Sequence, residues 1–330
     1  MASLGRYSFA NQDGIYRDDV YAGNPSWKET IIIFSKNRGA VFGLLFVIFM
    51  VVLAIWGPNF NSYTYDEIQM TRTNMPPRIP GLEKLGIFDG TLNGANMYEL
   101  KGATEEYYWF GTDALGRDLF TRFCQGTRIS LIVAVISALL SLVIGVSYGL
   151  VCGYYGGKLD LLMMRIIEII NGIPSLVIVS LLVVILKPGL TAIIVAMAIN
   201  GWTGMARLVR ANTLRLKQQE HIMASKTLGS SVPSILFREI FPNLLSSVIV
   251  MAMMEVPGAI FMESFLSFVG LGIPNPQASL GSLISDGYNH MLMYSFQLAI
   301  PAVFFAILMI SLNLCGDGLR DALDPKQRRS

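Results

Sequence analysis

Three carboxylates interrupt two of the apolar stretches of this chain: Glu168 in one, and Glu255 and Glu263 in the other. A charged side chain inside a membrane is costly, so it indicates a functional site by default and is paired or faces water. Glu168 has Arg165 on the same helical face and Asn171 beside it, which favours structural pairing or gating over contact with a solute. For Glu255 and Glu263, a role in a solute pathway and a role in packing both stay open.

No other constellation in the sequence indicates catalysis. Gly156-Gly157-Lys158 resembles a phosphate loop only superficially, because Cys152 stands where the first Gly of that motif belongs and no Ser or Thr follows the Lys. Cys124, Cys152 and Cys315 are too far apart for a ligand or disulfide pattern. We therefore expect a chain that is not an enzyme and holds no metal or cofactor, and a membrane-bound enzyme has no residue set to support it.

A polar, basic loop from Gln219 to Asn243 carries small residues at helical spacing. The spaced residues are Glu220, Ala224, Ser225 and Gly229. Gly229 predicts a helix stop, because only Gly enters the left-handed region cheaply, and Ser230 and Ser231 can cap a second helix that begins near Pro233. A small face lets another protein approach closely, so a docking helix–turn–helix and an ordinary connector are both open from the residues alone.

The composition places these residues in a polytopic membrane protein. Apolar residues make up 53% and charged residues 15% of the 330 positions, and the mean hydropathy is +0.51. The net charge of +2 says little, since the distribution of the charges decides the orientation. The first 37 residues contain no apolar run, so we expect a retained first anchor and no cleavable signal peptide.

The apolar runs predict an all-α fold with six transmembrane helices, each long enough for a hydrocarbon core of about 30 Å. The predicted parts are a cytoplasmic N-terminal tail (1–38), a first transmembrane helix (39–57), an extracellular segment (58–128), a five-helix core (129–315) with a cytoplasmic loop (207–243), and a cytoplasmic C-terminal tail (316–330). The core helices are expected at 129–155, 159–186, 190–206, 243–270 and 294–315. Basic residues gather in the loop and the tails, which predicts that both termini are cytoplasmic.

Two further patterns concern the shape of these helices. Small residues recur every fourth position in the second span, at Ser137, Ser141, Gly145, Gly149, Gly153 and Gly157. Such rows let helix backbones touch, and because four residues overshoot a turn, we expect contact with more than one neighbour or a right-handed crossing. Pro174 should kink the third span. Residues 27–34 should form an amphipathic stretch at the membrane interface. Residues 271–293 should form an external, re-entrant loop.

A polar passage precedes the second span. It contains Gly111, Thr112, Asp113, Gly116, Arg117 and Asp118. We expect Asp113 to cap the helix that follows, and Arg117 and Asp118 to pair with neighbours at the surface. A capped interfacial helix with no other role is the alternative.

Both passages resemble signatures of one family. The loop resembles the E-x-x-x-A-A-x-x-x-G and I-x-L-P signature of permease subunits of bacterial ABC importers, through Glu220, Ala224, Gly229, Ile240 and Pro242. Ser225 and Phe241 depart from it, but Ser is as small as Ala. The passage G-T-D-x-x-G-R-D, followed by G-x-R-I-S-L from Gly126 to Leu131, resembles C-type permeases of oligopeptide and dipeptide importers, and the likeness spans about residues 105–325.

The resemblance implies a type I importer fold with a small extracellular cap, in a bacterial inner or plasma membrane. It further implies that the chain forms half of a path for oligopeptides, together with a B-type permease. An extracellular binding protein would deliver the peptide to the Gly111–Asp118 region, and two ATPase subunits, which bind ATP and Mg, would dock on the loop through its coupling helix; no nucleic acid is involved.

Other readings of the same sequence remain open. Dipeptides, nickel or glutathione are alternative solutes for a permease of this type. An ion-gradient-driven secondary transporter that uses Glu168, Glu255 and Glu263 is the competing class. It would be favoured by inverted repeats, and we find no convincing repeat.

Overall fold

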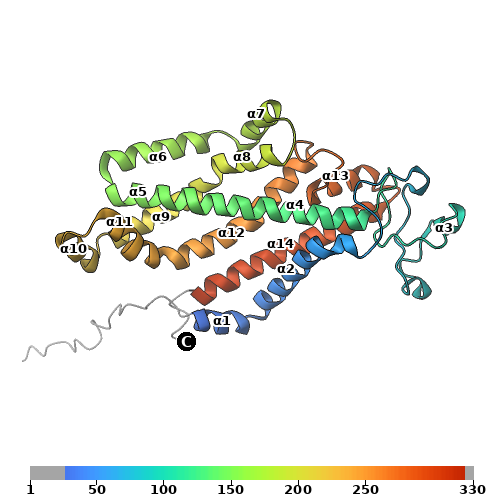
Figure 1. Cartoon of the computed structure of the whole chain (residues 1–330), viewed down its shortest axis with the longest axis horizontal. Coiled ribbons are helices and arrows are strands. Elements are labelled where there is room, and N and C mark those ends of the chain that lie inside the picture. The colour runs from blue at the N-terminus through green and yellow to red at the C-terminus, as the bar shows by residue number, and fades with distance from the viewer. Residues whose placement is uncertain (1–26, 324–330) are drawn as a thin grey trace, which may run out of the picture.

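The structure, a computed structural model, describes residues 27–323 as a bundle of long helices with a small cap at one end (Figure 1). The helices are α1 (Trp27–Lys36), α2 (Arg38–Trp56), α3 (Met97–Leu100), α4 (Leu119–Leu140), α5 (Val146–Tyr155), α6 (Gly157–Gly172), α7 (Ser175–Leu186), α8 (Leu190–Asn200), α9 (Trp202–Leu216), α10 (Glu220–Thr227), α11 (Val232–Ser234), α12 (Phe241–Phe268), α13 (Leu280–His290) and α14 (Ser295–Leu323). Two π-helical stretches, η5 (Ser141–Gly145) and η6 (Ile235–Ile240), join α4 to α5 and α11 to α12.

Five helical stretches of the described chain are long and apolar enough to cross a membrane. They cover Arg38–Asn59, Leu119–Tyr155, Leu190–Leu216, Val232–Phe268 and Ser295–Leu323. Helices α6 and α7 pass the same test together but are bent by 78°, and they make the sixth span if the pair is counted as one. The bend falls at Ile173-Pro174, so the kink predicted at Pro174 is confirmed; Pro has no N–H to donate to the preceding turn.

The predicted helix boundaries were wrong at several places, including the fourth span, which stays helical to Leu216 rather than ending at 206. The helix of the second span begins at Leu119 rather than at 129, because Asp118 caps it, ten residues earlier than predicted. The fifth span is helical from Val232. The last helix continues through residues 316–323, where Gly318 packs against Ala40 of α2. The N-terminal tail before residue 27 and the tail after residue 323 lie outside the described residues.

The small-residue row packs mainly against α9. A Cβ atom at Gly145, Gly149 or Gly153 would lie 2.6–2.7 Å from atoms of α9, and the Ser141 hydroxyl donates to the carbonyl of Gly201, directly before α9. Helix α12 also contacts the row at η5, where Glu255 lies beside Ser141, so the expected contact with more than one neighbour is confirmed. Helices α5 and α9 are therefore packed backbone to backbone.

The segment between α2 and α4, predicted to be extracellular, is an ordered cap with its own small core. Met75, Tyr98, Ala103 and Tyr108 are buried together, and Arg72 and Glu106 form an ion pair with an N···O distance of 2.7 Å. Short elements complete the cap: η2 (Gly57–Asn59), η3 (Met70–Arg72), η4 (Glu83–Leu85) and the antiparallel pair β1 (Thr91–Leu92) and β2 (Ala95–Asn96). Figure 1 places α3 of this cap at the end of the bundle opposite α10.

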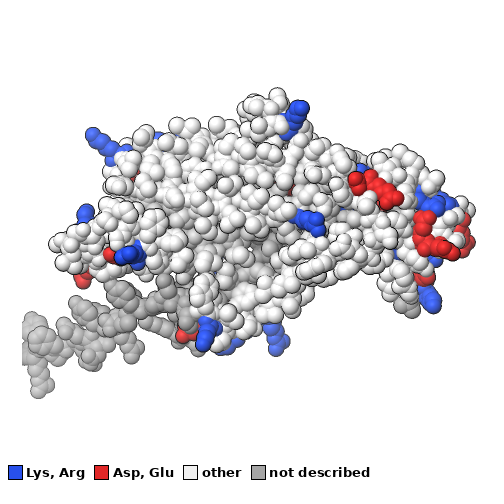
Figure 2. All heavy atoms as spheres, in the orientation of Figure 1, with Lys and Arg blue, Asp and Glu red and all other residues white. Residues whose placement is uncertain are grey.

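The surface agrees with this arrangement. Charged side chains gather mainly toward the two ends of the molecule, and the face between them is mostly uncharged (Figure 2). Apolar side chains of the membrane-facing helices, such as Leu161, Leu181 and Val184, are exposed. Such a belt is stable only in contact with lipid or with another membrane protein.

Candidate functional site

The loop after α9 folds as the predicted helix–turn–helix. Helix α10 ends at Thr227, and Gly229 follows with φ +85°, in the left-handed region that Gly enters without strain. The N–H of Leu228 donates to the carbonyl of Ala224 (2.9 Å) and the N–H of Ser230 to that of Ser225 (3.1 Å), which closes the helix end. Ser231 is the N-cap residue of α11, although its side chain makes no capping hydrogen bond.

This loop has an anchored side and an exposed side. Ile222 is 2% exposed and packs in a cluster that includes Ile235, Ile240 and Leu244. Glu220, Ala224 and Gly229 are exposed, Ser225 and Pro242 are partly buried, and Leu228 is 87% exposed. Helices α10 and α11 protrude from one end of the bundle (Figure 1), so the loop presents small side chains and one apolar tip at a fixed position.

The external motif differs from the prediction, because its residues are buried. Asp113 Oδ2 accepts from Arg117 Nε (2.7 Å), and Asp113 Oδ1 accepts from the backbone N–H groups of Leu115 and Arg117. Arg117 and Asp118 were expected to pair at the surface, but they are 5% and 2% exposed. The expectation failed because residues 69–75 of the cap fold over the motif: Gly116 has φ +76°, and a Cβ there would lie 1.9 Å from the Gln69 carbonyl oxygen.

The residue that caps α4 is Asp118, not Asp113. Asp118 Oδ2 accepts from the Thr121 N–H (2.8 Å) and from Asn61 Nδ2 (2.9 Å). Asp113 instead stabilises the turn before the helix and pairs with the guanidinium groups of Arg117 and Arg122. The Thr112 hydroxyl accepts from the Met75 N–H (2.8 Å), so the motif fastens the cap to the first turn of α4.

Two arginines that the sequence reading did not single out as site residues extend this external cluster. Arg122 is fully buried, lies 3.6 Å from Asp113 Oδ2, and donates to the Pro276 carbonyl (3.3 Å). Arg128 donates to the carbonyls of Ala54 (2.9 Å) and Ile55 (3.0 Å) at the end of α2. Two arginines inside an otherwise apolar stretch were the available signal, but their partners lie far away in the sequence.

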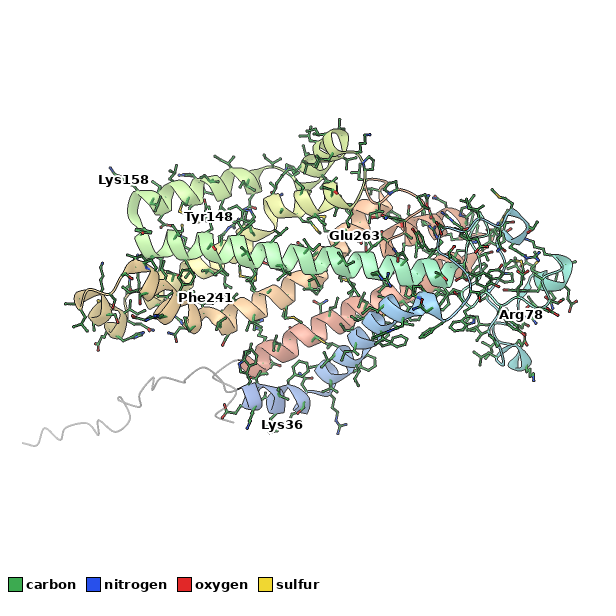
Figure 3. All side chains as sticks on the ribbon, viewed as in Figure 1. Lys36, Arg78, Tyr148, Lys158, Phe241 and Glu263 are labelled. Atoms are coloured by element: carbon green, nitrogen blue, oxygen red, sulfur yellow. The ribbon has the colours of Figure 1, made fainter. Side chains whose placement is uncertain are left out.

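The polar residues of the spans do not form one site. Arg165 and Glu168 form the expected pair, with an N···O distance of 2.6 Å, and both are exposed. The Asn171 side-chain oxygen lies 3.1 Å from the Thr203 hydroxyl of α9. Glu263 is fully buried and accepts from Ser130 (2.6 Å) and Ser267 (2.8 Å), in the middle of the bundle (Figure 3).

Glu255 stands apart from Glu263. It is partly buried, and its Oε2 atom has no hydrogen-bond partner among the described residues. The two carboxylates are eight positions apart, which separates them by about 12 Å along α12. The surroundings of Glu263 favour its packing role, whereas a pathway role for Glu255 stays a prediction.

Within residues 27–323, no group of three or more His, Cys, Asp or Glu side chains could hold a metal ion. Cys124, Cys152 and Cys315 are buried free thiols. The described residues therefore form an exposed helix–turn–helix loop, a cap fastened to α4 and a bundle of closely packed helices.

Comparison with known proteins identifies the family. The family described as binding-protein-dependent transport system inner membrane component matches residues 145–329, and the N-terminal TM domain of oligopeptide transport permease C matches residues 26–77. The chain is 42% identical over 303 residues to the oligopeptide transport system permease protein OppC of Bacillus subtilis, covering 92% of this chain and 90% of that protein.

Other relatives agree. The dipeptide transport system permease protein DppC of Bacillus subtilis is 41% identical and covers 96% of this chain and 90% of that protein, and OppC of Escherichia coli is 39% identical with 93% coverage of both. An inward-facing structure of the MetNI methionine ABC transporter has the same fold, with a TM-score of 0.51 and 20% identity, covering 62% of this chain and 96% of that chain. The chain therefore belongs to the family of binding-protein-dependent transport system inner membrane components, the permease subunits of ABC importers.

Proposed function

We propose that this permease forms half of the translocation path for oligopeptides in an ATP-driven importer. The main observation behind this proposal is the exposed α10 loop, whose small side chains and apolar Leu228 are held outward by the buried Ile222. Two similarities support the solute class: the N-terminal match to oligopeptide transport permease C and the 42% identity to an oligopeptide permease.

The partner subunits are inferred from the exposed α10 loop and from the family. Two ATPase subunits, each with its own ATP and Mg, dock at the cytoplasmic side, one of them on α10, and a B-type permease supplies the other half of the path. Closure of the ATPases pushes α10, and the bundle switches between inward- and outward-facing arrangements as rigid elements. Both termini are cytoplasmic, which the basic residues near α1 and in the α9–α12 loop support.

An extracellular binding protein delivers the peptide to the cap. Because Gly111, Thr112, Asp113, Gly116, Arg117 and Asp118 are buried, this contact falls to exposed cap residues and not to the motif itself. The motif supports that surface from beneath. Glu255, with its unpartnered oxygen, remains our candidate for a group beside the path.

Reconstitution tests this proposal. The chain, the B-type permease and both ATPases are placed in liposomes with the binding protein, and uptake of a labelled pentapeptide is followed with and without ATP. ATP-dependent uptake is the expected result. Uptake by this chain alone, driven by an ion gradient, would identify a secondary transporter instead.

Dipeptides are the second candidate solute, because a dipeptide permease is 41% identical over 96% of this chain. Competition between unlabelled dipeptides and pentapeptides in the same liposomes separates the two. Preferential inhibition by dipeptides, nickel or glutathione would replace oligopeptides as the solute while leaving the permease role intact.

A further inference from the structure

Helix α9 ends next to the turn that joins α5 to α6, and two cationic side chains of this end reach across to that turn. Arg210 lies on α9, and Lys217 follows its last residue, three positions before α10 begins at Glu220. Figure 1 shows the α5–α6 turn at the same end of the bundle as α10 and α11, and Lys158 marks it in Figure 3. The two cations therefore lie between the docking loop and the rest of the bundle.

Arg210 binds Asp160 of α6 with both arms of its guanidinium. Its Nη2 donates to Asp160 Oδ2 (2.6 Å) and its Nε donates to Oδ1. The side chains are 28% and 15% exposed, and the Cys152 thiol of α5 donates to the same carboxylate (2.8 Å). Such bidentate, charge-assisted pairs fix geometry better than single hydrogen bonds.

Lys217 holds the other side of the turn. Its ammonium donates to the carbonyls of Gly153 (2.8 Å) and Tyr154 (3.2 Å), which lie in the last turn of α5. Carbonyls at a helix C-terminus lack intrahelical partners and carry partial negative charge. One side chain thus satisfies two of these groups and joins the end of α5 to the start of the docking loop.

The backbones between these contacts pack directly against each other. A Cβ atom at Gly149 would lie 2.6 Å from the Ala206 carbonyl oxygen, and one at Gly153 would lie 2.7 Å from Thr213 Cβ. Farther along, the Asn171 side chain of α6 meets Thr203 of α9. Helix α6 is therefore joined to α9 at two places: by Asp160 near its first residue and by Asn171 near its last.

We infer that Asp160, Arg210 and Lys217 form a clamp that passes the displacement of α10 to α5 and α6. The inference rests on the proposed function. A push on α10 moves α9 directly, because only residues 217–219 separate them. The clamp makes the α5–α6 turn move together with α9. Helix α6 moves with this turn as far as the bend at Pro174. The three residues position the helices and touch neither ATP nor peptide.

The test measures peptide uptake and ATP hydrolysis in the same reconstituted complex. Arg210→Gln should keep ATP hydrolysis but lower the pentapeptide taken up per ATP by about tenfold, the factor expected when a charge-assisted hydrogen-bonded pair is lost. The exchange D160R/R210D should restore much of the ratio. Arg165→Gln is the matched control, because it removes an exposed Arg–Glu pair on the same helix and should leave the ratio unchanged.

A second measurement, hydrogen exchange, tests the clamp directly, so that a variant that transports poorly for another reason can be recognised. Hydrogen exchange of residues 157–160 in the assembled complex should rise in Arg210→Gln and return toward the wild-type level in the exchange variant. If Arg210→Gln does not assemble, restored assembly and coupling in the exchange variant supports the clamp, and their absence counts against it.

Two outcomes overturn the inference. One is an unchanged uptake-to-ATP ratio in Arg210→Gln; the other is an equal fall in Arg165→Gln. Failure of the wild-type complex to take up any pentapeptide would instead contradict the proposed function, and hydrogen exchange of residues 157–160 would still decide whether the clamp holds the turn.

Discussion

At one end of the bundle, the motif residues from Gly111 to Asp118 lie under the cap, whereas at the opposite end Glu220, Ala224 and Gly229 are exposed. Both sets resemble signatures of the same family. The residues under the cap already have partners within the chain: Asp113 binds Arg117, and Asp118 caps α4. The residues of the α10 loop present a surface, held in place by one buried side chain, Ile222.

This difference separates two uses of a sequence signature. A buried signature maintains the fold, so changing it should alter stability whether or not other subunits are present. An exposed signature fits a partner, so changing it should alter assembly or coupling and leave the isolated subunit stable. The predictions below test this division, from the largest effect to the smallest.

Asp113→Ala should destabilise the chain most, by about 3–5 kcal/mol, because it leaves the buried Arg117 and Arg122 without their shared carboxylate. Thermal unfolding of the purified subunit in detergent measures the change. Glu168→Ala is the control, since its ion pair is exposed. Equal stability of the two variants would place the external motif among the surface signatures.

Leu228→Ser should leave the stability of the isolated subunit unchanged but weaken its association with the ATPase subunit by about tenfold or more, as expected for an apolar side chain that loses about 1.5–3 kcal/mol of burial. The reason is that Leu228 is 87% exposed. Titration of the ATPase onto the subunit in nanodiscs gives the affinity. Unchanged affinity would show that the α10 tip is not in the contact.

Gly229→Val should impair coupling through the backbone, since φ is +85° and no atom crowds the position. A β-branched residue there costs about 1–3 kcal/mol and reshapes the α10–α11 turn. Uptake per ATP should fall while the bundle stays folded. Gly172→Ala, also in open space but in a helical backbone, should transport normally; normal transport by Gly229→Val as well would contradict the docking role.

Acid pH should loosen the cap slightly. The Arg72 guanidinium holds the pKa of the Glu106 carboxyl below its usual range. A lowered pKa in the folded state means that the pair stabilises the cap at neutral pH, and that this contribution is lost as the pH falls below about 4.3, the ordinary Glu value. Hydrogen exchange of residues 72–108 should rise there by a factor consistent with at most about 1 kcal/mol. Glu106→Gln should reduce this pH dependence to the part that comes from Asp89, whose pKa is lowered by its hydrogen bonds with Thr91.

The sequence by itself determined the class, the approximate spans and the turns. Long apolar runs require a membrane, Pro174 removes a backbone N–H from its helix, and Gly229 followed by Ser231 and Pro233 specifies a stop and a restart. These features depend on neighbours in the chain, which is why local patterns predicted them. The family signatures added the role that we propose for the exposed loop.

Only the tertiary structure decided which polar residues are buried and which helix each one serves. Arg117 meets Asn275, 158 positions away, and Arg210 meets Asp160 across 50 positions. Asp118 rather than Asp113 caps α4, and the small-residue row packs closely against α9 and also meets α12 at η5. The energy of a buried charge depends on partners that folding brings together, and no local pattern in the sequence records that distance.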